Sequence, residues 1–296
     1  MENELSNKRT GSVTSSDCVD LTTNGTRPMT EKELEDYKRN DTSGKRKTVD
    51  DYGKPFYTYV KDCRIERFFK QKLNNDVDVI AMSWGKLCEK LVHNLLPYKY
   101  LFHSNITIDH PRVNGWMGTP DGSIPIYYVL TKNTITGFYE YLDKGIEYID
   151  TVTDVKCPSS RKKFYELIEP LYDFDGFDAT PKANVNGNEA MQLIRKTVEG
   201  EKYYWQLVSN ACILNAKYAE LIVFMPYYED LAEIKLYNNT LKVPFYKVEN
   251  SKFEELPHIL KESGVNNINK IRFEVPAEDK AFLEKRVKEA IRLINE

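Results

Sequence analysis

The sequence is 296 residues long and carries 42 lysines and arginines against 45 aspartates and glutamates, a formal net charge of −3. This balance excludes a strongly basic protein, so any contact with an anionic partner must come from a local patch. Hydrophobic residues make up 41% of the chain, which is enough to bury a core. No run of about 18 apolar residues occurs, and the N-terminus lacks the apolar segment of a signal peptide. We therefore expect a soluble intracellular protein with no membrane partner.

Five cysteines are scattered along the chain without C-x-x-C spacing: Cys18, Cys63, Cys88, Cys157 and Cys212. This pattern argues against a zinc or iron–sulfur site and against a disulfide framework. We expect reduced thiols that mostly serve packing.

The first 50 residues or so are rich in Ser, Thr, Asn, Asp and Lys and poor in large apolar side chains. Such a segment buries too little surface to offset the entropy of ordering, so we predict a disordered polar arm at residues 1–50. Residues 51–296 are then a single domain, with a core at about 80–230 and a C-terminal helical extension to residue 296.

Hydrophobic periodicity predicts most of the elements of this domain. In chain order they are a helix at 81–96, strands at 105–109 and 116–119, a hairpin within 124–138, a strand at 148–156, helices at 161–168 and 203–216, a strand at 219–225 and a helix at 277–296. The apolar run at 219–225 is continuous, which is typical of a central strand covered on both faces. Residues 173–188 are rich in Gly, Asp and Asn and are predicted to form a loop.

Two short motifs combine carboxylates with turn and strand signals. Residues 120–122, Pro-Asp-Gly, are typical of a bend because proline pre-sets φ and glycine tolerates positive φ. Asp154 and Lys156 lie on a predicted strand, where they point to one face while Val155 points to the other. A carboxylate at a bend and an acid–lysine pair on a strand can together hold a divalent metal beside a phosphate. Taken alone, each motif also occurs as an ordinary turn or a solvated strand face.

Two further polar residues fit this arrangement. Glu89 lies on the helix predicted at 81–96, where its carboxylate could face the strand ends; a solvated helix edge is the alternative. Gln206 shares a polar stripe with Ser209 and Asn210 on the otherwise apolar helix at 203–216. Because buried amides need partners, we expect this stripe to face water, a ligand or a polar site.

In chain order, these features resemble the PD-(D/E)XK nuclease core, most closely its lambda exonuclease and YqaJ-type viral recombinase branch. The matching motifs are Gly-x-x-x-Glu at 85–89, Thr-Pro-Asp-Gly at 119–122, Asp-x-Lys-Cys-Pro at 154–158 and Tyr-Trp-Gln at 204–206, before the apolar strand that leads to Pro226. The resemblance covers about residues 80–230, and four ordered motifs are more specific than any one of them. It implies an α/β fold of restriction-endonuclease type, with a central mixed sheet flanked by helices in the order αβββαβ.

The chain departs from this branch at two points. Asp154 stands where the branch more often has Glu, which shortens the side chain by one methylene but keeps the charge. The 32 residues between Asp121 and Asp154 are also more than usual. This spacing demands an inserted hairpin, and without one Asp121 would be misassigned.

The resemblance implies a role for each of these residues. Asp121, Asp154 and the Val155 carbonyl would bind Mg²⁺, with Mn²⁺ as a substitute, and Glu89 would bind it directly or through water. Lys156 would orient or deprotonate the attacking water and stabilise developing charge, and Gln206 would help to position Lys156 or the water.

Candidate DNA contacts lie on two helices. Arg161, Lys162 and Lys163 follow the Asp154 strand and are candidates for phosphate contacts, with a solvated basic run as the alternative. Tyr204, with its neighbours Tyr203 and Trp205, could stack on a splayed base; packing in the core is the alternative.

The function that the resemblance implies is a Mg²⁺-dependent exonuclease that hydrolyses double-stranded DNA from its ends, of phage recombination or repair type. Two alternatives stay open, a catalytically inactive nuclease-fold module that binds DNA or protein, and an endonuclease of restriction type. A single-strand annealing protein is an expected partner, and some members of the branch form rings, so a homo-oligomer is expected too. The expected location is the cytoplasm, that of the host if the protein is viral.

Overall fold

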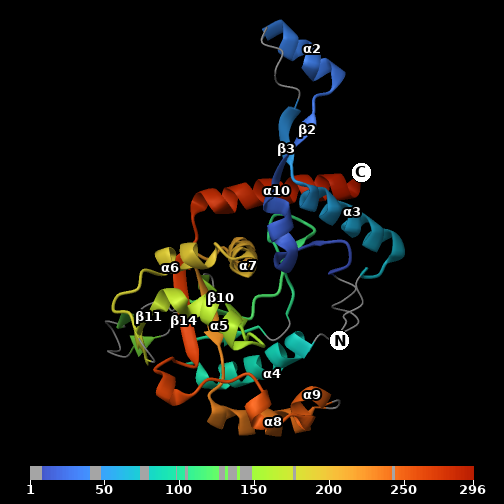
Figure 1. Ribbon diagram of the computed structural model, residues 1–296. Coiled ribbons are helices and arrows are strands. Elements are labelled where there is room, and N and C mark those ends of the chain that lie inside the picture. Colours follow the sequence, from blue (N-terminus) through green and yellow to red (C-terminus); the bar gives the residue numbers. More distant parts are fainter. Residues whose placement is uncertain are drawn as a thin grey trace.

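A five-stranded mixed sheet lies at the centre of the molecule, with helices on both of its faces (Figure 1). In this computed structural model the described residues are 9–40, 48–73, 80–97, 99–103, 106–126, 131–132, 139–140, 149–175, 178–241 and 244–296. No helix in this part of the chain combines the length and apolarity needed to cross a bilayer.

The central sheet has the strand order β14-β13-β10-β7-β4. Its strands are β4 (Leu101–Phe102), β7 (Gly122–Pro125), β10 (Ile149–Lys156), β13 (Tyr218–Phe224) and β14 (Ile268–Glu274). Strand β10 runs parallel to β13, and the other neighbours are antiparallel. On β13, Leu221 and Val223 pack on one face of the sheet, and Ile222 and Phe224 pack on the other. The predicted central strand, covered on both faces, is therefore confirmed.

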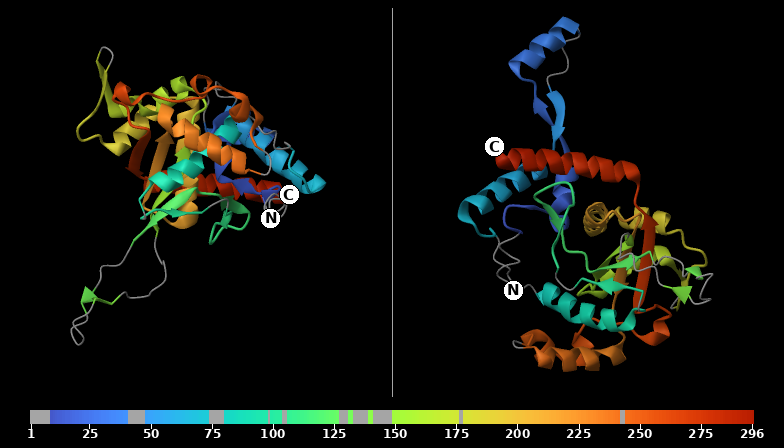
Figure 2. Two further views of the ribbon diagram at one scale, coloured as in Figure 1. Left: turned by 90° about the horizontal axis from the view of Figure 1, so that it is seen from below. Right: turned by 180° about the vertical axis from the view of Figure 1, so that it is seen from behind.

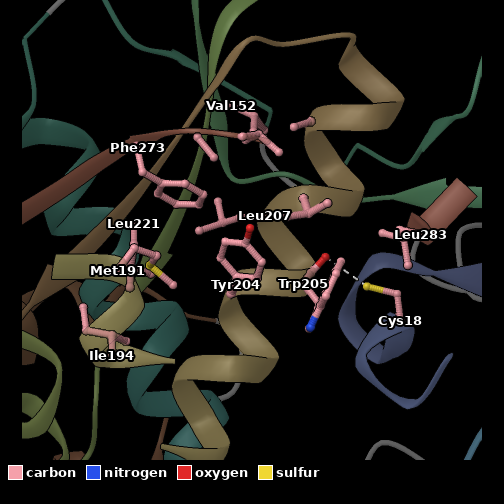
Figure 3. Packing of buried hydrophobic residues seen from close by; sticks show 14 of the residues in the cluster. Cys18, Val152, Met191, Ile194, Tyr204, Trp205, Leu207, Leu221, Phe273 and Leu283 are labelled. Carbon is pink, nitrogen blue, oxygen red and sulfur yellow. Dashed lines mark hydrogen bonds between the residues drawn. The ribbon is translucent and has the colours of Figure 1, made fainter. Parts of the chain in front are cut away.

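One face of the sheet is covered by α5 (Arg161–Ile168), α6 (Gly187–Ile194) and α7 (Val198–Leu214). Figure 3 shows this core around α7, where Leu207 and Tyr204 meet Phe273 of β14 and Leu221 of β13. The C-terminal helix α10 (Ala277–Asn295) packs on the outer side of α7, and α3 (Lys54–Phe69) packs on α10. These layers account for the larger of the two hydrophobic clusters.

The other face is covered by α4 (Ile80–Leu95), α8 (Leu231–Thr240) and α9 (Tyr246–Asn250), which lie below the sheet in Figure 1. Leu91, Ile234 and Val248 from these helices pack with Val155 of β10. Short 3₁₀ helices complete the connections: η2 (Glu169–Leu171), η3 (Tyr228–Asp230), η4 (Phe253–Glu255) and η5 (Lys261–Ser263). Because both faces of β10 are covered, alternate side chains along this strand contact different helices.

Most long predicted elements are confirmed, as α4, β10, α5, α7, β13 and α10. The strands predicted at 105–109 and 116–119 exist as β5 (Ile108–Asp109) and β6 (Trp116–Gly118), but outside the central sheet. They form a separate sheet with β1 (Val13–Thr14), in the order β1-β6-β5. The chain leaves this sheet where Pro120, which has no N–H, interrupts the ladder, and it enters the central sheet at Gly122.

Two hairpins project from the body. The predicted insert between Asp121 and Asp154 contains the antiparallel pair β8 (Thr131–Lys132) and β9 (Tyr139–Glu140), seen at the lower end of the left view in Figure 2; the rest of the range 124–138 lies partly outside the described residues. The loop predicted at 173–188 is wrong, since β11 (Tyr172–Asp175) and β12 (Asp178–Pro181) pair there and α6 begins at Gly187. Tyr172 and Ala179 anchor this second hairpin in the core, while its other strand residues are exposed and include three aspartates and a threonine. This polar composition explains why the strands were predicted as a loop.

The prediction of a disordered arm is wrong for residues 13–22. Val13, Cys18 and Leu21 have no exposed surface, and the 3₁₀ helix η1 (Ser15–Thr22) packs on α7 and α10. The hydroxyls of Ser15 and Ser209 lie 2.8 Å apart, so η1 covers the polar stripe of α7 that was expected to face a polar partner. A few apolar residues at the right positions anchor this segment, and averaging the composition over 50 residues concealed them.

The next segment projects away from the body. Strands β2 (Asn24–Pro28) and β3 (Thr48–Tyr52) pair as an antiparallel ribbon that carries α2 (Glu31–Asn40), at the top of Figure 1. Arg27 pairs with Glu33 at 2.7 Å and Arg286 of α10 stacks on Tyr52 at 4.5 Å, so the base of this ribbon is tied to the C-terminal helix. Residues 1–8 and 41–47 of the predicted arm lie outside the described residues.

Candidate active site

Asp121 and Asp154 meet at one end of two neighbouring strands. Asp121 directly precedes β7, and Gly122 is the register partner of Thr153 in the antiparallel strand β10. The backbone N–H of Val155 donates a hydrogen bond to Oδ2 of Asp121 at 2.7 Å. Two carboxylates separated by 32 residues in the sequence are therefore held side by side by sheet register and by a hydrogen bond.

Asp154 is fully buried on the face of β10 that α7 covers. Gln206 Nε2 donates a hydrogen bond to Oδ1 of Asp154 at 3.0 Å. The ammonium of Lys156, two residues along the same strand face, forms an ion pair with Oδ2. Both carboxylate oxygens have a partner, so the orientation of Asp154 is fixed.

Lys156 is enclosed by acidic and aromatic side chains. Its Nζ lies 5.0 Å from the centre of the Tyr203 ring, on α7. Burial alone would lower the pKa of Lys156, but the carboxylates of Asp154 and Asp121 outweigh it and raise that pKa above the ordinary value. The side chain is thus a fixed cation at neutral pH.

Glu89 of α4 approaches the Asp154–Lys156 pair from the opposite face of the sheet. Burial raises its pKa, and the charge of Asp154 raises it further, while Lys156 and Lys86 oppose the shift. Its Oε1 lies 3.5 Å from Nε2 of His93, one helical turn onward. Glu89 is therefore within electrostatic range of the Asp154–Lys156 pair.

His93 is a neighbour of the site that the sequence interpretation missed. Its ring stacks on Phe102 of β4 with 3.9 Å between centroids, which holds it against Glu89. The i,i+4 spacing between Glu89 and His93 was the available sequence signal. Tyr203 was considered as a base-stacking or core residue, and its ring in fact faces Lys156.

The donor set fits a hard divalent cation. Burial raises the pKa of Asp121 well above the usual range, and the nearby charges of Asp154 and Glu89 add to the shift. Such mutual repulsion is relieved by a positive ion, and carboxylate oxygens are ligands that Mg²⁺ prefers. Among the described residues, no group of three or more His, Cys, Asp and Glu side chains has metal-binding geometry. Asp121 and Asp154 would therefore hold such an ion together with water molecules rather than within a complete set of protein ligands.

The candidate phosphate contacts lie at the first turn of α5, whose N-cap Ser160 accepts a hydrogen bond from Lys163 N at 3.2 Å. Arg161 is exposed, and the Lys162 side chain is 85% exposed with Glu166 at 3.8 Å. The ammonium of Lys163 is paired with Glu199 of α7. Lys162 and Arg161 are therefore more accessible to an anion than Lys163.

Tyr204 cannot stack on a base as predicted. Its side chain is 1% exposed, its hydroxyl donates to Asp279 of α10, and the Arg195 guanidinium lies 3.7 Å over its ring. Trp205 is also in the core, 5% exposed, which agrees with the alternative interpretation. On α7 the position of Tyr204 falls on the stripe that faces the sheet, one turn before Leu207 and Val208, and this burial explains the error.

The fold described above is similar to that of exonucleases of known structure. The crystal structure of an alkaline exonuclease from Laribacter hongkongensis is similar over 99% of this chain and 92% of that chain, with a TM-score of 0.51 and 12% identity. The same enzyme in complex with dAMP gives a TM-score of 0.50, again at 12% identity and with the same coverage. A phage-related exonuclease from Haemophilus somnus has a TM-score of 0.46 and 11% identity over 96% of this chain and 93% of that chain.

Comparison of the sequence with family models gives no match, and no curated protein matches it. The similarity is therefore one of fold, at low sequence identity.

Proposed function

We propose that the chain is a Mg²⁺-dependent deoxyribonuclease with a PD-(D/E)XK core, acting as an exonuclease on the ends of double-stranded DNA. The observation that carries the proposal is the convergence of Asp121, Asp154, Lys156 and Gln206 at one end of β7 and β10. Buried carboxylates cost free energy unless they are paired or bind a cation, so a protein without such a site has no physical need for them.

The order of elements supports this core. Helix α4 precedes β4, β7 and β10 of the central sheet, and α7 and β13 follow. With α5, α6 and the β11–β12 hairpin counted as insertions between β10 and α7, this order is compatible with αβββαβ. Glu89 is then on the first helix, the two aspartates are at the second and third strands, and Gln206 is on the second helix. The similar fold of an alkaline exonuclease adds support of a general kind.

Asp121, Asp154 and the Val155 carbonyl would hold the cation, with Glu89 as a direct or water-mediated ligand; Mn²⁺ would substitute for Mg²⁺. A bound divalent ion would supply charge that polarises the phosphoryl oxygen and lowers the pKa of a water molecule. Gln206 fixes the Asp154 carboxylate by its hydrogen bond, which keeps one oxygen in a constant direction.

Lys156 supplies a positive charge beside the reacting phosphate. Because its pKa is raised, the ammonium form dominates at neutral pH. The ammonium would orient the attacking water and stabilise the charge that develops on phosphate. The ring of Tyr203 and the carboxylate of Asp154 hold the ammonium in place.

For the substrate, we propose that a strand end reaches this cluster along the first turn of α5, with Arg161 and Lys162 on the phosphates and Lys163 available once it leaves Glu199. The Laribacter enzyme was crystallised with dAMP, a mononucleotide. By analogy, we propose mononucleotides or short fragments as products here. A role in phage recombination or repair, with a single-strand annealing partner and a ring-shaped oligomer, belongs to the same proposal.

The test is an assay on linear, nicked and covalently closed circular duplex DNA, with Mg²⁺ and with a chelator. We expect steady loss of linear DNA into mononucleotides or short products, persistence of closed circles, and no hydrolysis when the metal is chelated. Rapid cutting of closed circles into discrete fragments would establish an endonuclease instead. Binding of DNA without hydrolysis of any form would establish the inactive binding module.

A further inference from the structure

His93 has a buried nitrogen that lies beside Glu89, the proposed metal ligand on α4. Because the two residues are four positions apart in one helix, they share a face, and the His93 side chain leans back toward the N-terminus, over Glu89. Nε2 of His93 lies 3.5 Å from Oε1 of Glu89. This nitrogen is buried and has no hydrogen-bond partner among the described residues. A buried donor without a partner costs free energy, so a small rotation of Glu89 that shortens this contact is favourable.

The sheet holds the His93 ring in one orientation. The ring stacks on Phe102 of β4, with 3.9 Å between centroids and 25° between planes. Phe102 is the register partner of Gly122 in β7. A Cβ at Gly122 would lie 2.9 Å from the Leu101 carbonyl oxygen and 3.4 Å from Cδ1 of Phe102. The glycine that follows Asp121 therefore allows β4 to lie close to β7 and supports the ring on which His93 rests.

Glu89 needs such support more than Asp154 does. Asp154 has Gln206 on one carboxylate oxygen and Lys156 on the other. The Glu89 side chain is longer by one methylene and is 31% exposed, so it has more rotamers to lose when it binds a cation. A donor at Oε1 reduces this loss of entropy on binding and leaves Oε2 to face the cation.

We propose that His93 is a positioning residue that donates a hydrogen bond from Nε2 to Oε1 of Glu89 and so directs Oε2 toward the divalent cation. This role rests on the proposed nuclease function, in which Glu89 binds the cation directly or through water. It needs no change of protonation, because the imidazolium and one neutral tautomer both carry a proton on Nε2. Loss of a hydrogen bond that orients a metal ligand typically weakens metal binding about 10- to 100-fold.

The test uses Mn²⁺ alone, titrated calorimetrically into the full-length protein without DNA. His93→Phe keeps a ring on Phe102 but has no donor, so it should raise the Kd for Mn²⁺ by at least about tenfold. His93→Gln places an amide N–H near the position of Nε2 and should restore most of the affinity. His93→Asn, whose amide corresponds to Nδ1, should not. Asn94→Ala, at an exposed position on the same helix, should bind Mn²⁺ as the unsubstituted protein does.

A double-mutant cycle with Glu89→Ala separates positioning from a general structural effect. If His93 acts through the Glu89 carboxylate, His93→Phe should change the Mn²⁺ affinity little further in the Glu89→Ala background. Additive effects of the two substitutions would overturn the positioning role. Circular dichroism checks that each variant is folded. Should His93→Phe not fold, equal Mn²⁺ affinities of His93→Gln and His93→Asn would overturn the role just as directly.

Failure of this proposal and failure of the proposed function give different results. Mn²⁺ binding that is the same in His93→Phe and in the unsubstituted protein would overturn the role of His93 and leave the nuclease proposal intact. Absence of Mn²⁺ binding to the unsubstituted protein would overturn the proposed metal site and the role of His93 with it. Hydrolysis of linear duplex DNA gives a second readout. His93→Phe should need about tenfold more Mg²⁺ for its half-maximal rate, while the rate at saturating Mg²⁺ falls less.

Discussion

Gln206 Nε2 donates a hydrogen bond to Oδ1 of Asp154 over 3.0 Å, and this single contact ties α7 to the acidic end of β10. The other oxygen of the same carboxylate faces the Lys156 ammonium. The helix and the strand are thus joined at the proposed reacting centre, and Tyr204, Leu207 and Val208 of α7 are buried in the core. A change at Gln206 should consequently act on chemistry and on local stability together.

Gln206→Ala should lower kcat about 10- to 100-fold, because Asp154 loses the donor that fixes its direction. A buried acceptor left without one partner costs about 1–3 kcal/mol of stability. Steady-state kinetics and urea unfolding measure the two effects. The matched control is Gln192→Ala, at an exposed position on α6, which should change neither quantity. Unchanged kcat in Gln206→Ala would remove Gln206 from the proposed site.

Lys156→Met should reduce turnover by about 10²–10³-fold, as expected when a charge that stabilises the transition state is removed. It also leaves the buried Asp154 carboxylate without its cation, which costs about 3–5 kcal/mol. Circular dichroism at the assay temperature checks that the variant is folded. Adding Asp154→Asn to Lys156→Met should restore part of the lost stability, since the uncompensated charge is gone. Near-normal turnover of Lys156→Met would refute the assignment of Lys156.

The main pattern of the fold could be predicted because it rests on long, regular signals. Helix α4 and strand β13 each carry a sustained apolar pattern. The first and last residues of both elements in the structure differ from the predicted ones by one position. Strand β4 has only two residues, and η1 is anchored by a few apolar side chains in a polar segment, so neither had a pattern long enough to detect.

The candidate site was predictable in composition but not in geometry. The pairing of Asp154 and Lys156 follows from strand alternation. The contact between Gln206 and Asp154 joins residues that are 52 positions apart. The family resemblance placed Gln206 at the site, but with Lys156 or the water as its expected partner. Tyr204 was misassigned because its burial is set by the way α7 packs on the sheet, which one sequence does not reveal.

Asp121→Asn should change how stability depends on pH. Burial and the charges of Asp154 and Glu89 raise the pKa of Asp121 well above its unfolded value of 3.8, so between these two values the folded state binds more protons than the unfolded state. The free energy of unfolding therefore falls as pH rises through this window. Asn cannot ionise, so the variant should lose less stability between pH 4 and neutral pH and be the more stable protein at neutral pH, although inactive.

Urea unfolding across this pH range, in the presence of a chelator, measures the effect. Asp178→Asn, at an exposed position on β12, is the control and should follow the unsubstituted protein. Parallel pH profiles for the unsubstituted protein and Asp121→Asn would show that Asp121 is not in a repulsive carboxylate cluster.

Leu21→Ala should destabilise the protein by about 2–5 kcal/mol, because Leu21 is fully buried between the body helices. Leu34→Ala on the projecting α2, where the side chain is only partly buried, should cost much less. Thermal unfolding of the two variants compares them directly. Equal and small effects would mean that η1 contributes little to the core and that the arm prediction was right for residues 13–22 after all.

Lys162→Ala should weaken the salt dependence of DNA binding. Each phosphate contact that is lost lowers the slope of log Kobs against log salt concentration by about 0.9. Lys162 is 85% exposed and lies 3.8 Å from Glu166, whereas Lys163 is already paired with Glu199, so Lys163→Ala should reduce the slope less. Lys261→Ala is the matched control, since Lys261 is exposed and lies 3.9 Å from Glu229 on a different element. Binding titrations on linear duplex DNA at several salt concentrations give the slopes. Equal slopes for Lys162→Ala and Lys261→Ala would place the DNA path away from the first turn of α5.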